Sequence, residues 1–328
     1  MKPLLISGIQ PTGKLHIGNY LGMLKNAVEL QNSGKYHCFY FIADYHSLTE
    51  DFSPKEKTGQ ILDLALDFLA AGMDPKKSTI FIQSAISSHA ELALILNALT
   101  PMGELERMTQ FKDKVRRQKE NVNAGLFTYP TLMAADILIY KAEFVPVGED
   151  QLQHLELTRT LARRFNNRFG KTFPEPQALL TQVPRLMSLS DPHKKMSKSE
   201  PNGCLFLDDP PKSIETKIKR AVTDSGKEIV FDPIHKPAIS NLLLIYSAMS
   251  DEPVETLKEK FRNKGYAEFK KALAILLIER LSIFQKRKKS FAKTISDVKE
   301  ILEVGSHKAA VHANKTLAEV KKKLGLFY

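Results

Sequence analysis

Short apolar segments alternate with longer amphipathic ones through the first half of the chain. The segment at 38–43 is apolar without alternation, which is typical of a strand buried on both faces, and similar runs predict strands at 4–7 and 79–83. Apolar residues at three- and four-residue spacing predict helices over about 18–32 and 53–72. Strands that alternate with helices are typical of parallel sheets with right-handed crossovers, so we predict a doubly wound, Rossmann-like α/β fold.

Local signals mark where these helices begin and end. Gly34 stands where a glycine commonly follows the last turn of a helix. Ser53–Glu56 has the sequence of a capping box, with Pro54 at the first helical position. Ser88, with Glu91 three residues later, predicts the cap of the next helix.

Strand signals become sparse after about residue 190, and the second half is predicted to be mostly helical. The polar loop at 190–203 marks the boundary, so we expect a catalytic α/β domain at 1–190 and a smaller helical domain at 191–299. The expected helices cover residues 211–222, 238–249, 254–262, 266–290 and 307–324.

The net charge of +11 over 328 residues is unevenly distributed. Residues 1–190 carry 21 basic and 19 acidic side chains, whereas residues 191–328 carry 27 and 18. A basic second half indicates a polyanionic partner, for which RNA, DNA and an acidic membrane surface all remain open.

Cysteine usage and hydropathy restrict the class of protein. Two cysteines, Cys38 and Cys204, exclude a disulfide framework and a four-thiolate zinc site. The longest apolar runs, such as 272–278, are far shorter than the roughly 18 residues that a membrane span needs, and the start of the chain has too short an apolar core for a signal peptide. We therefore expect a cytoplasmic protein without a membrane partner. The chain contains no tryptophan.

The segment Gly8–Leu15 follows a predicted strand and nearly fits the phosphate-binding P-loop pattern. That pattern requires a hydroxyl after the lysine to bind Mg²⁺, and here Leu15 follows Lys14. Pro11 also removes a backbone N–H that such a loop would use. These two departures argue against a P-loop ATPase.

The next residues, His16-Ile17-Gly18-Asn19, lie where a loop enters a helix. A helix N-terminus presents free N–H groups and partial positive charge, and imidazole and carboxamide groups can donate to phosphate oxygens. Gly18 would let a flat base approach the backbone. Taken alone, these four residues fit a capped helix with a surface histidine better than a phosphate site.

A second motif, Lys194-Lys195-Met196-Ser197-Lys198-Ser199, lies in the loop at the domain boundary. Ammonium groups beside hydroxyls suit a triphosphate whose charge must be neutralised as it leaves. A solvated basic linker or a general nucleic-acid contact fits the same residues.

In this order, the two motifs resemble the HIGH and KMSKS signatures of class I aminoacyl-tRNA synthetases, with Asn19 in place of the last histidine. Further stretches over nearly the whole chain are similar to the bacterial tryptophan-specific branch of that class. They are residues 7–13, 103–112, 129–130 with 133–138, 145–151, 154–159 and 221–225.

The resemblance implies that tryptophan carboxylate attacks ATP, with Mg²⁺ delivered by the nucleotide and no dedicated metal site, before the acyl group passes to tRNA(Trp). It implies catalytic roles for the phosphate-binding side chains of Lys112, Lys195 and Lys198. The implied ATP-binding residues are Gln10, Pro11, Thr12, His16, Gly18, Asn19, Gly148, Glu149, Asp150, Leu186, Lys195, Met196, Ser197, Lys198 and Ser199.

Asp136 is the carboxylate on which the implied tryptophan site depends. It lies in an apolar predicted helix, and a buried carboxylate needs a donor. The resemblance implies that this donor is the indole N–H, whereas a lysine or a backbone N–H would serve in a purely structural role. The other implied tryptophan-binding residues are Tyr129, Gln151, Met133, His46 and Ile6, the last at a position that is usually aromatic in the family.

The resemblance also implies a homodimer and a C-terminal helix at 300–328 that packs back on the α/β domain. The basic runs at 286–289 and 321–323 are candidate tRNA contacts, as is the run Lys114, Arg116 and Arg117, although solvated helix faces fit them equally. A tyrosine-specific synthetase and a nucleotidyltransferase of the same fold remain the alternatives.

Overall fold

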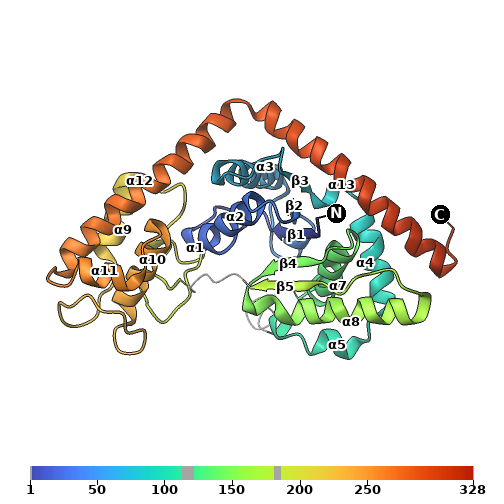
Figure 1. The fold of residues 1–328 in the computed structure, drawn as a ribbon, viewed down its shortest axis with the longest axis horizontal. Coiled ribbons are helices and arrows are strands. Elements are labelled where there is room, and N and C mark those ends of the chain that lie inside the picture. The colour runs from blue at the N-terminus through green and yellow to red at the C-terminus, as the bar shows by residue number, and fades with distance from the viewer. Residues whose placement is uncertain (1, 113–121, 181–185, 328) are drawn as a thin grey trace.

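The computed structural model describes residues 2–112, 122–180 and 186–327 (Figure 1). Five parallel strands form one sheet in the order β3-β2-β1-β4-β5. This confirms the predicted doubly wound parallel sheet. The strands are β1 (Leu4–Ile9), β2 (His37–Ile42), β3 (Ser78–Ile82), β4 (Phe144–Val147) and β5 (Gln177–Leu180).

The strand order reverses beside β1, because the chain first extends the sheet through β2 to β3 and then returns to add β4 on the other side. In such sheets, ligands bind outside the carboxyl ends of the two strands between which the order reverses. Here those strands are β1 and β4.

Helices cover both faces of the sheet. One face packs on the first helical segment, which consists of α1 (Ile17–Asn19), a π-helical stretch (Tyr20–Lys25) and α2 (Asn26–Asn32), and on α3 (Pro54–Ala71). The other face packs on α4 (Ser88–Leu99), α7 (Ala124–Leu138) and α8 (Leu152–Phe169), while α5 (Met102–Glu106) contacts α7.

The second half is helical, as the sequence predicts, and its apolar core continues into that of the first sheet face. It consists of α9 (Pro211–Arg220), α10 (Pro237–Ser250), α11 (Val254–Lys260) and α12 (Tyr266–Lys293). The last helix, α13 (Ile295–Leu324), follows α12 after Thr294 and returns along β3 and α4, so the two long helices form an arch over the molecule (Figure 1).

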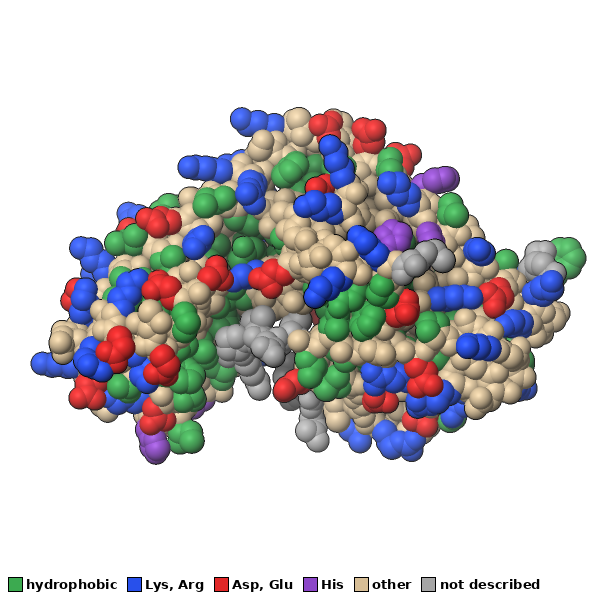
Figure 2. Space-filling view, viewed as in Figure 1, with side chains coloured by type: hydrophobic (Ala, Val, Ile, Leu, Met, Phe, Trp, Pro, Cys, Tyr) green, Lys and Arg blue, Asp and Glu red, His purple; other side chains and the backbone are tan. Residues whose placement is uncertain are grey.

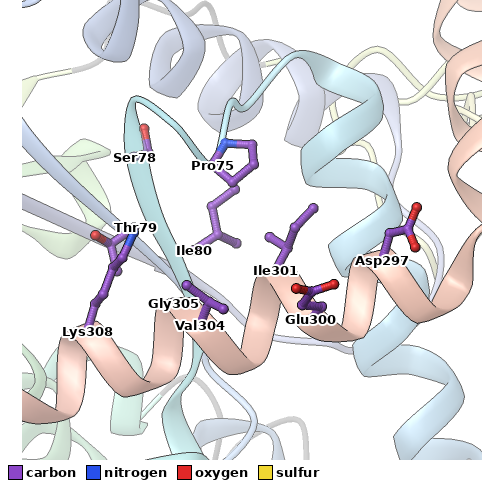
Figure 3. A pocket seen from close by; sticks show the side chains of 10 residues that line it. All are labelled: Pro75, Ser78, Thr79, Ile80, Asp297, Glu300, Ile301, Val304, Gly305 and Lys308. Atoms are coloured by element: carbon purple, nitrogen blue, oxygen red, sulfur yellow. The ribbon is translucent and has the colours of Figure 1, made fainter.

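At Gly305, α13 lies directly against the edge strand β3 (Figure 3). A Cβ at this position would lie 1.8 Å from the carbonyl oxygen of Ile80. Next to it, the backbone N–H of Ile82 donates to Ser306 Oγ at 3.3 Å. The helix therefore covers the outer edge of the sheet and accepts one of its hydrogen bonds.

Three details of the predicted elements are wrong. The final helix starts at Ile295 rather than at residue 307, and it runs through Gly305 because that glycine fits against β3. The Ser53 side chain makes no cap hydrogen bond. Ser88 does not cap its helix either, because its hydroxyl donates to Asn314 of α13 at 2.5 Å.

The surface charge is dispersed on the face shown in Figure 2. Lys and Arg side chains are interspersed with Asp and Glu over both halves of this face rather than gathered in one patch. Among the residues that the structure describes, no helix has the length and apolarity needed to span a membrane.

Candidate functional site

A cavity of about 310 Å³ opens at the carboxyl ends of β1 and β4, where the strand order reverses. Its wall includes the end of β1, the π-helical stretch, α7 and the end of β4. All six residues of the implied amino-acid site line it, and these are Ile6, His46, Tyr129, Met133, Asp136 and Gln151. Of the implied nucleotide site, Gln10 and Gly148 reach this cavity.

Gly8, at the end of β1, sets the shape of one wall. A Cβ at this position would lie 2.4 Å from Phe41 Cζ, inside the ring's van der Waals surface. Glycine therefore lets the Phe41 ring lie across the strand, and both residues line the cavity.

Asp136 is 1% exposed and is the buried charge of the cavity. His46 Nε2 lies 2.7 Å from its Oδ2, and His89 Nδ1 and Gln83 Nε2 lie 2.6 and 2.8 Å from its Oδ1. Burial alone would raise the pKa of this carboxyl, but the hydrogen bonds from the two histidines outweigh it, so the pKa lies below the ordinary value. Asp136 is an ionised acceptor at neutral pH.

The partners of Asp136 differ from the structural alternative that the sequence allowed, which was a lysine or a backbone N–H. Two histidines and one amide supply the donors instead. Sequence reasoning missed His89 and Gln83, because they lie 47 and 53 residues upstream of Asp136 and nothing in their local pattern links them to it.

Tyr129, which precedes Asp136 on the same helix α7, also lines the cavity. Its hydroxyl lies 2.7 Å from His154 Nε2 and donates to Gln110 Oε1 at 3.3 Å. Burial raises the pKa of the phenol above its ordinary value, so the hydroxyl keeps its proton. Gln110, which also lines the cavity, donates to the backbone oxygen of Asp150 at 3.0 Å and thereby joins α7 to the loop after β4.

His16 and Asn19 form a reciprocal cap at the start of α1. The Gly18 N–H donates to His16 Nδ1 at 3.0 Å, and the His16 N–H donates to Asn19 Oδ1 at 3.1 Å. Burial, with Lys198 and Lys195 nearby, lowers the pKa of His16 to about 4. The imidazole is therefore neutral, with Nδ1 used as an acceptor and Nε2–H left as its donor.

The motif at 194–199 folds against this helix start. Met196 is buried, and its N–H donates to the oxygen of Leu186 at 3.1 Å, which fixes the middle of the motif. Ser197 and Ser199 hydroxyls lie 2.8 Å apart. The Lys198 ammonium donates to the backbone oxygens of Thr12 and Gly13 at 3.3 and 3.4 Å, so the two sequence motifs are brought together.

Lys198 is a partly buried cation. Burial lowers its pKa below the ordinary value, although Glu50 opposes this shift. Lys195 of the same motif is exposed, and its backbone forms an isolated antiparallel β-bridge with Met187.

Several predicted residues lie outside the cavity wall. Lys112 is exposed at the end of a described helical turn, and Glu149 and Asp150 are exposed in the turn after β4. Pro11 and Thr12 do not line the cavity. They lie in the loop that contacts Lys198 through the backbone oxygen of Thr12. The basic run Lys114, Arg116 and Arg117 lies outside the described residues.

Sequence reasoning also missed one wall of the cavity. Gly22, Met23 and Asn26 line it from the π-helical stretch and the start of α2. A regular helical repeat would present different side chains, and the wider π turn has no sequence signature that distinguishes it from an α-helix.

Comparisons with known proteins agree on one family. The family described as tRNA synthetases class I (W and Y) matches residues 2–282. A tryptophan–tRNA ligase of Caldanaerobacter subterraneus is 50% identical over 98% of both chains. The tryptophanyl-tRNA synthetase structure from Mycoplasma pneumoniae has a TM-score of 0.89 and 38% identity, covering 100% of this chain and 99% of that one. The Campylobacter jejuni enzyme, with ADP and tryptophan bound, has a TM-score of 0.84 and 34% identity, covering 98% and 99%.

Proposed function

We infer that this chain, which belongs to the class I tRNA synthetases for tryptophan and tyrosine, activates L-tryptophan with ATP and charges tRNA(Trp). The observation that carries the assignment is the cavity at the strand-order reversal, where an ionised Asp136 meets apolar walls. The overall reaction yields Trp-tRNA(Trp), AMP and pyrophosphate. It makes the chain a ligase.

In the first step, a carboxylate oxygen of tryptophan attacks the α-phosphorus of ATP. A new phosphorus–oxygen bond forms, the bond to the β-phosphate breaks, and pyrophosphate leaves with its electron pair. Both reactants must be held in line, and the negative charge must be offset as it moves to the leaving group. In the second step, a ribose hydroxyl of the tRNA terminal adenosine attacks the acyl carbon, and AMP leaves.

Asp136 would accept the indole N–H of the substrate through Oδ2, which receives one hydrogen bond from His46 and retains a second acceptor position. Ile6, Met133 and Phe41 would enclose the ring. Tyr129 and Gln151 would hold the α-amino group. Apolar contacts around a buried carboxylate acceptor suit a ring that carries one donor.

The nucleotide would extend from the cavity toward the helix start at His16. Gln10, Thr12, Gly18 and Asn19 would line it, with Gly148, Glu149 and Asp150 on the ribose side and Leu186 near the base. Mg²⁺ bound to the phosphates would add charge neutralisation and would use phosphate and water oxygens rather than a protein cage.

The lysines at 195 and 198, together with Lys112 and the serine hydroxyls of the same motif, would hold the phosphates. Lys198 supports this role because it already lies over the Thr12–Gly13 backbone, beside His16. A partly desolvated ammonium interacts more strongly with a phosphate than a fully solvated one.

We propose the catalytic unit 1–190 with 300–328, and the helical unit 191–299 as the tRNA-binding part. The contact of α13 with β3, and the excess of basic side chains after residue 190, support this division. We further propose a cytoplasmic homodimer. Steep weakening of tRNA binding with salt would support phosphate contacts, and a flat response would reject them.

ATP–pyrophosphate exchange, screened over all amino acids, tests the function. Exchange that depends on tryptophan is expected. Exchange with tyrosine alone would favour the tyrosine branch of the family, and exchange with no amino acid would favour a nucleotidyltransferase.

A further inference from the structure

A chain of buried polar side chains contacts Asp136 without forming part of the cavity wall. His89 and Gln83 are both fully buried, and both bond Oδ1 of Asp136. Behind His89, its Nε2 lies 2.8 Å from the hydroxyl of Tyr140, which is itself buried. None of these three residues lines the cavity, so none contacts a ligand there.

The hydrogen bond with Asp136 determines which nitrogen of His89 must carry a proton. The ionised carboxylate only accepts hydrogen bonds, so the proton of His89 resides on Nδ1. On the opposite side of the ring, His89 Nε2 shares a hydrogen bond with the Tyr140 hydroxyl. Burial raises the pKa of Tyr140, so its phenol retains the proton that this arrangement needs.

Gln83 is oriented by the backbone on its other side. The N–H of Tyr45 donates to Gln83 Oε1 at 3.0 Å, which leaves the Nε2 group facing Asp136 Oδ1 at 2.8 Å. The amide is therefore held as a donor and cannot rotate to present its oxygen without losing both bonds.

These contacts occupy three of the acceptor positions of the Asp136 carboxylate. Oδ1 receives two hydrogen bonds, from Gln83 and His89, and Oδ2 receives one, from His46. A carboxylate oxygen accepts about two hydrogen bonds. One acceptor position thus remains on Oδ2, and Asp136 is among the residues that line the cavity.

We propose that Gln83, His89 and Tyr140 are positioning residues that set the ring specificity of the site. They hold Asp136 ionised and fixed in rotation, with a single acceptor position toward the substrate. This inference rests on the proposed function, because it takes the indole N–H as the fourth donor.

The physical reason is the cost of burying the carboxylate. His46 and His89 together offset the effect of burial, so loss of the His89 donor raises the pKa of Asp136 and increases the population of its protonated form, which also donates. Such a group would bind a ring that carries an acceptor almost as well as one that carries a donor. The selectivity for an N–H group would then decline, even where the apolar contacts with the ring persist.

The test compares two ligands that differ at the proposed donor. Because the chain contains no tryptophan, fluorescence of bound L-tryptophan gives its Kd without background from indole in the protein. The Kd of β-(3-benzothienyl)-L-alanine, in which sulfur replaces the N–H, is measured by competition. For the unchanged protein we expect tryptophan to bind about 10- to 100-fold more tightly.

His89→Leu removes the donor, Tyr140→Phe removes only the hydroxyl behind it, and His89→Asn restores a donor near the position of Nδ1. We expect the preference for tryptophan to fall about tenfold in His89→Leu and about threefold in Tyr140→Phe, with His89→Asn between the unchanged protein and His89→Leu. Phe81→Leu is the matched control, because its ring packs 6.2 Å from the His89 ring without a hydrogen bond. It should weaken both ligands equally.

An unchanged preference in both His89→Leu and Tyr140→Phe would overturn the proposal. If His89→Leu does not fold, Tyr140→Phe decides, because it leaves the ring volume almost unchanged. Failure of the proposed function has a different signature, in which the unchanged protein shows no tryptophan-dependent exchange or binds both ligands equally.

Discussion

Lys288 of α12 forms an ion pair with Asp67 of α3, and the two charged atoms lie 2.7 Å apart. This contact joins the helical half of the chain to a helix on the sheet. Asp63 and Asp208 lie 2.8 and 3.0 Å from the same ammonium. The Lys288 ammonium is therefore paired with three carboxylates where the helical half meets the helix on the sheet.

Lys288→Met should weaken the folded state. It leaves Asp67 buried without its cation, and loss of one partner from a buried pair costs on the order of 3 kcal/mol in the free energy of unfolding. Urea unfolding measures the change. Lys289→Met, on an exposed neighbour, should have almost no effect, and equal effects of the two changes would contradict the role of the cluster.

The stability that depends on Asp67 should decrease as the pH rises. Burial raises its pKa to about 7 against an ordinary value of 3.8, with Asp63 and Asp208 adding to the shift and Lys288 opposing it. The folded chain thus keeps a proton that the unfolded chain releases, and this contribution is complete below pH 3.8 and is lost as the pH passes 7.

Relative to Asp67→Asn, which does not titrate, the free energy of unfolding should therefore fall by on the order of 2 kcal/mol between about pH 5 and pH 8. Denaturant curves at several pH values give this difference. A difference that stays constant, or that grows in favour of the unchanged protein, would reject the raised pKa.

Gly305→Ala should destabilise the contact of α13 with β3. The added Cβ would lie 1.8 Å from the Ile80 oxygen, so the helix must move away from the strand, at a cost of about 1–3 kcal/mol. The control is Gly59→Ala in α3, where no atom lies within 4 Å. There alanine should raise the unfolding midpoint slightly, because it has the higher helix propensity.

Lys198→Ala should slow tryptophan-dependent pyrophosphate exchange by about 10²-fold, because it removes a charge placed over the Thr12–Gly13 backbone. Lys194→Ala is the matched control in the same motif. Lys194 is exposed and lies 3.5 Å from Asp191, so its loss should change exchange by less than about threefold. Comparable losses in the two variants would show that the positive charge of the motif as a whole, rather than the position of Lys198, supports exchange.

Asp136→Ala should abolish tryptophan activation while ATP still binds. The change removes the acceptor and leaves His46, His89 and Gln83 without their shared partner. Exchange kinetics and nucleotide binding are measured on the same preparation. An unchanged kcat/KM for tryptophan would reject Asp136 as the group that binds the indole.

The sheet and most helices were predictable because their signals are local. The unalternated run at 38–43 forms most of the buried strand β2, which lies between β3 and β1. Gly34, with a φ of 66°, follows α2 as its position predicts. Short-range periodicity reports which faces are buried, and a doubly wound sheet follows from the order of elements.

The environment of the site was not predictable in the same way. The resemblance to a family pointed to Asp136, but its donors are brought to it only by the tertiary fold. His89 reaches it through the packing of α4 against α7, and Gln83 reaches it from the turn that follows β3. Ser88 likewise fits a cap locally, and its hydroxyl is used instead for a contact 226 residues away. Such side chains serve long-range contacts that local patterns do not encode.

The position of α13 has a consequence for synthesis on the ribosome. All five strands are translated before residues 295–324, so β3 emerges with its outer edge uncovered, and an uncovered edge is a site for pairing with other chains. Gly305 and Ser306 can shield that edge only late in translation. A nascent chain that stalls before α13 would therefore expose an aggregation-prone edge that the finished protein does not have.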